Sequence, residues 1–284
     1  MKDRLRSLWD FDDLDESEAR LEAQLDEEGS DEGRAEVLTQ LARIAALRGD
    51  FEAGDTLIDR AVALAGRSGV ALARVELERG RVRRSNGEVE AALPLFESAF
   101  SRALGAGQDF VAADAAHMAA LAAPDRDGFV RWTERGIELA EQRADASYWL
   151  GPLLNNLGWE YYDAGELEHA LGAFERALQV REHDPENAAA VEIACYAVGK
   201  TLRGLRRAPE ALPLLERAVE SATRRGASDG WLHEELAEDY AAVGRMDDAR
   251  DHARQAIPLL EADDPSLAED PERKARLLSL AEHG

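Results

Sequence analysis

The sequence has few cysteines, few aromatic residues and no long apolar run. Only one of the 284 residues is a cysteine, Cys195, which excludes an internal disulfide framework and fits a reducing compartment. The N-terminus turns acidic within its first residues, and no apolar run reaches the length that a membrane helix needs. We therefore expect a soluble, cytoplasmic protein.

Basic residues are also scarce. Asp and Glu number 58 against 34 Lys and Arg, which gives a formal net charge of -24. A field of this sign repels phosphate backbones and anionic membrane surfaces, so neither nucleic acid nor a membrane is an expected partner. The same acid-rich composition is equally compatible with adaptation to a saline cytoplasm or with a GC-rich genome.

Patterns typical of catalytic or metal sites are incomplete. Residues 226–230 read Gly-Ala-Ser-Asp-Gly, the spacing of a nucleophile elbow, but helical patterns flank them where that motif requires a strand. His233 begins a zincin-like phrase, yet Ala237 stands where the second histidine is needed. The histidines His117, His169, His183 and His252 are scattered across the repeats without ligand spacing. The sequence predicts no enzyme, no metal and no cofactor.

A turn-and-helix phrase, close to Gly-acid-x-x-x-Ala, recurs along the chain. Its copies begin at Gly49, Gly87, Gly165, Arg206 and Gly244. Amphipathic runs that end in a small residue recur at intervals of 38, 37, 41, 41 and 38 residues: Ala61, Ala99, Gly136, Ala177, Ala218 and Ala256. Glycine supplies a left-handed C-cap at the turn, and small residues let helix axes approach closely. A lone helix pair cannot bury both of its faces, so neighbouring pairs must stack.

These copies resemble the tetratricopeptide repeat family, whose helices read Trp-x2-Leu-Gly-x2-Tyr and Ala-x3-Phe-x2-Ala. The best copy has Leu154, Leu157, Gly158, Tyr161, Ala170, Phe174 and Ala177. The resemblance covers roughly residues 33–260. The repeat period here is longer than the roughly 34 residues usual in the family, and in this it looks like the longer-helix repeats of kinesin light chains and Rap-type bacterial regulators. The resemblance implies an all-α fold: a right-handed α-solenoid of about six tetratricopeptide-like helix pairs with N- and C-terminal capping helices.

Three parts of the chain are predicted from this pattern. Residues 1–32 are an acidic N-terminal segment with a capping helix, residues 33–262 the superhelical repeat domain, and residues 263–284 a C-terminal capping helix. Longer loops are predicted near 104–109, 143–147, 182–187 and 224–230.

Both ends are expected to cover the repeats. At the N-terminus, Ser17 is the predicted N-cap of a helix over 18–26, followed by a loop over 29–33. Trp9 and Phe11 are predicted to pack on the first repeat, because terminal repeats need a cover. At the C-terminus, a final helix over residues 271–281 is expected to turn three leucines inward: Leu277, Leu278 and Leu280.

The resemblance implies a concave channel lined by the first helix of each pair. If the motif residues pack on the second helix, the opposite side of the first helix faces a ligand. The predicted binding residues on that side are Arg81, Arg84, Asn155, Asn156, Trp159, Tyr162, Tyr196, Lys200 and Arg203. The same register also exposes Arg74, Leu77, Glu78 and Ile193, and in the last repeat Glu234, Glu235 and Glu238.

This predicted face gathers arginine, lysine, asparagine and aromatic residues in an otherwise acidic chain. Asparagine amides can pair with an extended backbone, basic side chains can hold a carboxylate, and Trp and Tyr anchor a partner. The prediction is a scaffold or adaptor that binds a protein or peptide, acidic or ending in a C-terminal carboxylate. The alternative is a ligand- or peptide-gated regulator, similar to Rap-type sensors, that changes curvature on binding. We expect a monomer or a weak homodimer. The alternative to a binding face is that these residues are an ordinary helix surface, paired with the many local acids.

Overall fold

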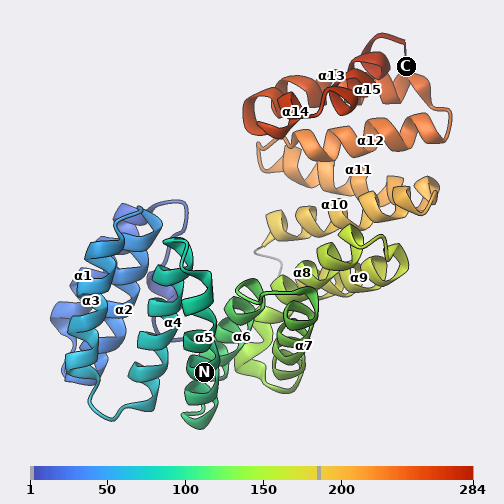
Figure 1. Cartoon of the computed structure of the whole chain (residues 1–284). Helices are drawn as coiled ribbons and strands as arrows, with labels where there is room; N and C mark the ends of the chain where they lie inside the picture. Colours follow the sequence, from blue (N-terminus) through green and yellow to red (C-terminus); the bar gives the residue numbers. More distant parts are fainter. Residues whose placement is uncertain (1–2, 184–186, 284) are drawn as a thin grey trace. The chain divides into compact units, whose positions relative to one another are not determined.

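The computed structural model describes residues 3–183 and 187–283. Within these ranges the regular structure is entirely helical, with fifteen α-helices and two 3-10 helices (Figure 1). Six helix pairs follow one another along the chain: α2 (Asp31–Leu47) and α3 (Phe51–Ala65), α4 (Gly69–Ser85) and α5 (Val89–Gly105), α6 (Asp109–Leu121) and α7 (Arg126–Gln142), α8 (Leu150–Asp163) and α9 (Leu167–Glu182), α10 (Ala188–Gly204) and α11 (Ala208–Arg224), α12 (Gly230–Ala242) and α13 (Met246–Asp263). The predicted all-α solenoid of six pairs is confirmed.

The helices form two compact units, Met1–Leu153 and Leu154–Gly284, and the boundary falls within α8. Shorter elements flank the repeats: η1 (Arg6–Leu8) and α1 (Leu14–Glu27) before the first pair, η2 (Ala144–Trp149) after α7, and α14 (Ser266–Glu269) and α15 (Pro271–His283) after the last pair. The predicted division at residues 32 and 262 stays a prediction, because contact between elements does not establish which segments fold independently.

The turn inside five of the six pairs has one residue with a left-handed backbone; in the described residues, the turn between α6 and α7 has none. Gly165, between α8 and α9, has a φ of 74°, which glycine adopts without a steric penalty. Arg206 occupies the corresponding place between α10 and α11, and its φ is 61°. It is the one non-glycine with positive φ in the described ranges, which explains why its copy of the turn phrase looked weak in the sequence.

Close helix packing within a pair depends on a small residue opposite a large one. Gly80, Gly158 and Gly199 each lie against a large side chain sixteen residues later: Phe96, Phe174 and Leu215. A methyl group at any of these glycines would come within 3.0 Å of that side chain. The large partners are fully buried, so each repeat centres its core on this contact.

The N-terminal helix differs from its prediction. It begins at Leu14, because the Asp13 carboxylate accepts a hydrogen bond from the Glu16 amide at 2.9 Å and so acts as the N-cap. Ser17 is buried inside this helix, and its hydroxyl donates to the Asp10 carbonyl at 2.7 Å. The predicted loop over 29–33 is also too long, since Ser30 caps α2 and the helix starts at the next residue.

Elsewhere the predictions hold in part. Loops near 104–109 and 224–230 are present, whereas residues 144–149 form the 3-10 helix η2. The predicted loop over 182–187 includes residues 184–186, which lie outside the described residues. The final helix is confirmed, but only Leu277 is fully buried in it; Leu278 is 42% exposed and Leu280 is half-buried. The extra short helix α14 instead contributes Leu267 to this terminal core.

Candidate functional site

Aromatic side chains gather on the predicted ligand side of the second unit. The Trp159 ring centroid lies 5.5 Å from that of Tyr162 and 6.2 Å from that of Tyr196 on the neighbouring helix α10. All three are half-buried, and Trp159 also contacts the core residue Phe174. Ile193, one helical turn before Tyr196, is 52% exposed. The structure thus brings three of the predicted residues together with an exposed aliphatic side chain, and we name this group the aromatic face.

Two predicted cations lie beside the aromatic face, and both contact a carboxylate. Glu235 of α12 accepts hydrogen bonds from Arg203 Nε at 2.7 Å and from Lys200 Nζ at 3.1 Å. Burial alone would raise the pKa of Glu235, but Arg203 and Lys200 outweigh burial and lower it. Lys200 also donates to the Tyr196 hydroxyl at 3.2 Å. Glu238 and Asp239 also lie close enough to raise the pKa of Arg203, so several acids surround these two cations.

The two predicted asparagines lie on α8, before Trp159. Both are half-buried. The Asn155 side-chain oxygen is shielded from solvent, and it has no hydrogen-bond partner within the described residues. A buried acceptor without a donor is costly, so the present position of the Asn155 amide is one that the folded chain maintains at a cost.

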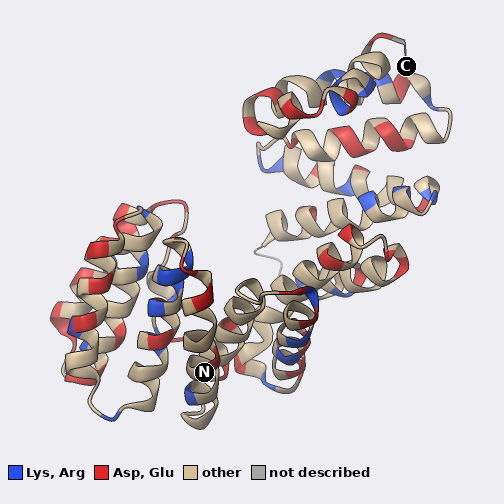
Figure 2. Cartoon of the chain, in the orientation of Figure 1, with Lys and Arg blue, Asp and Glu red and all other residues tan. Residues whose placement is uncertain are grey.

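The acids of the last repeat do not form an open surface. Glu234 accepts from Arg273 Nε at 2.7 Å, and Glu238 accepts from Arg276 Nε at 3.3 Å. Both arginines belong to α15, and Figure 2 shows the Lys and Arg positions of α15 in blue and the Asp and Glu positions of α12 in red. The expectation that these acids face a ligand is wrong for Glu234 and Glu235, which are buried, because the chain supplies their cations itself.

In the first unit, the predicted ligand side is likewise occupied by internal pairs. Arg81 is 8% exposed and bonds to Glu78 at 2.5 Å and to Asp114 of the next first helix. Arg84 is half-buried, and its Nε lies 3.4 Å from the Leu121 carbonyl. Arg74 pairs in the same way with Glu36 of the preceding first helix at 3.0 Å. Ion pairs between successive first helices therefore recur in both units, and the sequence reading did not detect them.

The structure also unites two histidines that seemed unrelated in the sequence. The Nδ1 atoms of His233 and His252 are 2.8 Å apart, and the His252 ring stacks on Tyr240. Burial, followed by the His252 charge, lowers the pKa of His233 to about 4. Both rings are thus neutral at neutral pH, with one nitrogen donating to the other. Over the described residues, no group of three or more His, Cys, Asp or Glu side chains could hold a metal ion.

This pair makes stability depend on pH. The pKa of each histidine is depressed in the folded state, so the unfolded chain binds protons first as the pH falls below about 6.5. We expect the wild type to lose about 2 kcal/mol more stability between pH 6.5 and 4.5 than the variant His233→Gln/His252→Gln. Urea unfolding at a series of pH values measures this. The exposed His169→Gln is the control and should follow the wild type; equal slopes for all three proteins would contradict the prediction.

Cys195 is fully buried in the core of the second unit. Burial raises the pKa of its thiol, although Arg217 beside it acts in the opposite direction. A packed thiol agrees with its position in the repeat. Among the described residues, no helix is long and apolar enough to cross a membrane.

Comparisons with known proteins agree with this architecture. A family model described as tetratricopeptide repeat matches residues 153–183. No curated protein gives a significant match. The crystal structure of BtubC (BKLC) from P. vanneervenii is similar in fold, with a TM-score of 0.63 at 17% identity, covering 76% of this chain and 93% of that one. The apo form of RapI is also similar, with a TM-score of 0.70 at 15% identity, covering 94% of this chain and 76% of that one. The chain thus contains a match to the tetratricopeptide repeat at residues 153–183, and its helix pairs share the fold of these two solved structures.

Proposed function

We propose that this protein is an interaction scaffold whose second unit holds a segment of a partner protein against the aromatic face. The observation that carries the proposal is the cluster of Trp159, Tyr162 and Tyr196 next to the exposed Ile193. Single exposed apolar residues are ordinary on protein surfaces. Tryptophan and tyrosine gathered around one are instead typical of the residues that dominate binding energy in interfaces.

The polar groups around the aromatic face indicate the chemistry of the bound segment. If the Asn155 side chain turns outward on binding, its unpaired oxygen would accept a hydrogen bond from a backbone N–H of an extended segment. Lys200 and Arg203, whose side chains are 26% and 31% exposed, would share a ligand carboxylate with Glu235. The partial exposure of these two cations supports an acidic side chain or a C-terminal carboxylate in the ligand.

The test is loss of capture when the aromatic face is truncated. In the face variant, Asn155→Ala/Tyr162→Ala/Ile193→Ala, the changes remove contact area and the orphaned acceptor without breaking an ion pair. Arg203 is left intact because its loss would leave the buried Glu235 poorly paired. We expect partners that bind the wild type to bind this variant at least tenfold more weakly, a loss of about 1.4 kcal/mol or more.

The matched control truncates three exposed apolar residues of the same unit that lie away from the aromatic face: Val243→Ala/Met246→Ala/Leu278→Ala. Proteins captured by wild type and control, but not by the face variant, are identified by mass spectrometry. Affinities are then measured by calorimetry with the purified partner. Undiminished binding to the face variant would remove this face from the proposal.

A further inference from the structure

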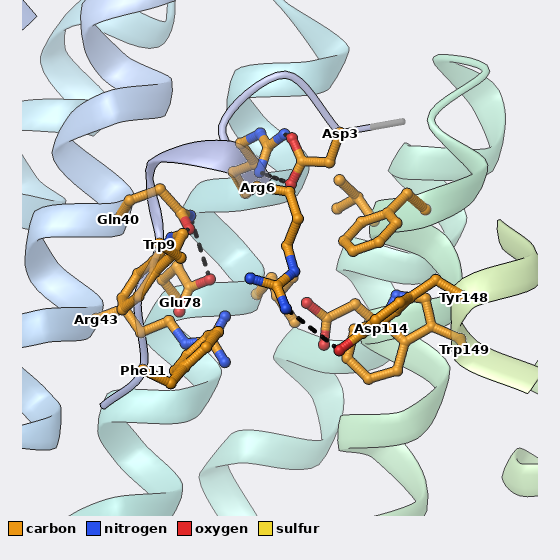
Figure 3. A pocket seen from close by; sticks show the side chains of 14 residues that line it. Asp3, Arg6, Trp9, Phe11, Gln40, Arg43, Glu78, Asp114, Tyr148 and Trp149 are labelled. Atoms are coloured by element: carbon orange, nitrogen blue, oxygen red, sulfur yellow. Dashed lines mark hydrogen bonds and ion pairs between the residues drawn. The ribbon is translucent and has the colours of Figure 1, made fainter. Parts of the chain in front are cut away.

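The first unit carries its own occupant on the ligand side of its repeats. Residues Asp3–Asp12, which we name the N-terminal strap, cross this side before α1 begins (Figure 3). Asp3 bonds to Arg74 of α4, Trp9 Nε1 donates to the Gln40 side-chain oxygen of α2 at 3.0 Å, and Arg6 reaches the hydroxyl of Tyr148 in η2 at 3.4 Å. The strap therefore touches side chains that belong to separate elements of the first three repeats.

The strap contacts Gln40 and Arg43, which occupy register positions that form the ligand side elsewhere in the chain. Gln40 and Glu78 each stand two residues before the small packing residue of their first helix, as Asn156 does in the second unit. Arg43 and Arg81 each follow that small residue directly, as Trp159 does. Since equivalent positions of a repeat point to the same side, the strap lies where a ligand of these repeats would lie.

Aromatic and aliphatic side chains anchor the strap. Leu5 is 1% exposed and Trp9 is 8% exposed, both within the core of the first repeat. Phe11 stacks on Trp9 with ring centroids 4.8 Å apart but remains 47% exposed. The Arg43 guanidinium lies 5.1 Å from the Trp9 ring centroid and 5.2 Å from that of Phe11. The prediction that Trp9 packs on the first repeat is confirmed, whereas Phe11 packs mainly on Trp9.

The fit beneath the strap is incomplete. A cavity of about 80 Å³ remains between the strap, α2, α4, α6 and η2. One carboxylate oxygen of Glu78 and the indole N–H of Trp149 line this cavity and have no hydrogen-bond partner within the described residues. Glu78 is only 1% exposed, so the missing partner is a cost that the folded chain carries. A better-matched segment would remove that cost.

All hydrogen bonds between the strap and its support in the described residues involve a side chain: among them, Arg4 donates to Glu28, Glu36 and the Gly33 carbonyl, and the Ser17 hydroxyl bonds to the Asp10 backbone. The strap's one regular element is the three-residue helix η1, and its backbone-to-backbone hydrogen bonds in the described residues are all internal: Arg6 to Asp3, Leu8 to Leu5, and Trp9 to Arg6. A segment without backbone pairing to its support can be exchanged for another without breaking secondary structure.

We propose that the N-terminal strap is an internal ligand, and that the face of α2, α4 and α6 binds a partner segment of the same chemistry once the strap is displaced. The partner segment has an aromatic side chain for the slot between Gln40 and Arg43, an acid for Arg74 and a basic side chain directed at Tyr148. The inference concerns a different face from the proposed function and does not depend on it.

The test uses the strap sequence itself as the probe. A fluorescein-labelled peptide of residues 1–13 is titrated with the full chain and followed by fluorescence anisotropy. In the wild type the attached strap competes at a high effective concentration, so the peptide binds weakly. In the strap-release variant, Arg6→Ala/Trp9→Ala, we expect at least a tenfold lower Kd for the same peptide. A peptide carrying Trp9→Ala should bind neither protein.

Two controls locate the site. Ser7→Ala/Asp12→Ala changes exposed strap residues and should behave as the wild type. Adding Gln40→Ala to the strap-release variant removes the acceptor of the Trp9 indole and should weaken peptide binding at least tenfold. Equal peptide affinity for wild type and strap-release variant would overturn the inference, as would no binding to a strap-release variant whose helical circular dichroism is intact.

Hydrogen exchange on the unmodified chain provides a second measurement, because Trp9→Ala also removes core packing. If the strap opens, we expect the amides of residues 5–12 to exchange at least a hundredfold faster than the buried amides of α2. Equal protection of the two segments would make the strap a permanent part of the core and end the inference. Neither experiment uses the aromatic face, so failure here leaves the proposed function standing.

Discussion

Replacing Phe174 by alanine is expected to destabilise the second unit by about 3–5 kcal/mol, the range typical of a buried phenylalanine. The ring is fully buried, contacts Trp159 and covers Gly158. Its loss leaves a cavity that the rigid helix pair cannot fill. Urea unfolding followed by circular dichroism measures the change, and a loss below about 1 kcal/mol would show that the pair collapses onto the vacated space.

Gly158 lies on the other side of the contact with the Phe174 ring, and its substitution tests the same packing from that side. Gly158→Ala places a methyl group against the Phe174 ring, and we expect a loss of about 1–3 kcal/mol from overpacking. The first repeat has Ala42 and Ile58, also sixteen residues apart, where the fourth has Gly158 and Phe174. The double variant Gly158→Ala/Phe174→Ile reproduces that combination. Its loss of stability should therefore be smaller than the sum of the losses in the two single variants.

Gly172 supplies the matched control for this series. It lies within α9, and a methyl group there meets nothing within 4 Å. Gly172→Ala should be neutral or stabilising by up to about 1 kcal/mol, because alanine is the better helix former. If Gly172→Ala and Gly158→Ala were equally harmful, helix bending rather than contact with the ring would be the cause.

The same small-and-large spacing explains why the fold could be predicted from the sequence. A glycine or alanine is followed sixteen residues later by a larger apolar residue in four of the pairs: Ala42 and Ile58, Gly80 and Phe96, Gly158 and Phe174, Gly199 and Leu215. This pattern depends only on local helix geometry. The helix boundaries at the N-terminus could not be predicted as well. Asp13 and Ser17 are both good N-caps, and only the contact of Ser17 with Asp10 decides between them.

The candidate sites were predicted less completely, because they depend on contacts between repeats. Register alone placed Trp159 and Tyr196 on one side, and the structure brings their rings together. Register could not show that Arg81 meets Asp114, or that Lys200 meets Glu235, since each pair joins residues more than thirty positions apart. Such pairs join α2 to α4, α4 to α6 and α10 to α12, so aligning charges between successive copies is the signal that could have found them.

The second prediction with a large expected effect on stability concerns Asp239. Its side chain is fully buried beside α10, and neither carboxylate oxygen has a hydrogen-bond partner within the described residues. Burial, then the charge of Glu235, raises the pKa of Asp239 to about 7, against a smaller opposing effect of Arg203. Glu238 on the same helix adds to the rise. The fold thus favours the protonated carboxyl, which asparagine mimics in size and charge.

The sign of the effect follows from proton binding. Between about pH 3.8 and 7 the folded state holds the Asp239 proton while the unfolded chain releases it, so the stability contributed by this group falls as the pH rises. The penalty is complete above pH 7 and absent below pH 3.8. Asp239→Asn should therefore stabilise the protein by up to about 4 kcal/mol at pH 8.5, at 1.36 kcal/mol per pKa unit, and have almost no effect at pH 4.

Urea unfolding at pH 4, 6 and 8.5 distinguishes this from a simple gain in packing. The exposed Asp251→Asn is the control and should change stability little at pH 8.5. A benefit of Asp239→Asn that is the same at all three pH values would exclude a titrating carboxyl as its cause. The free energy of unfolding of the wild type falls at low pH because of His233 and His252, and it falls at high pH because of Asp239. Removing the carboxylate alone should consequently shift the pH of maximum stability upward and enlarge the loss on acidification, because Asp239 no longer offsets the histidines as the pH falls.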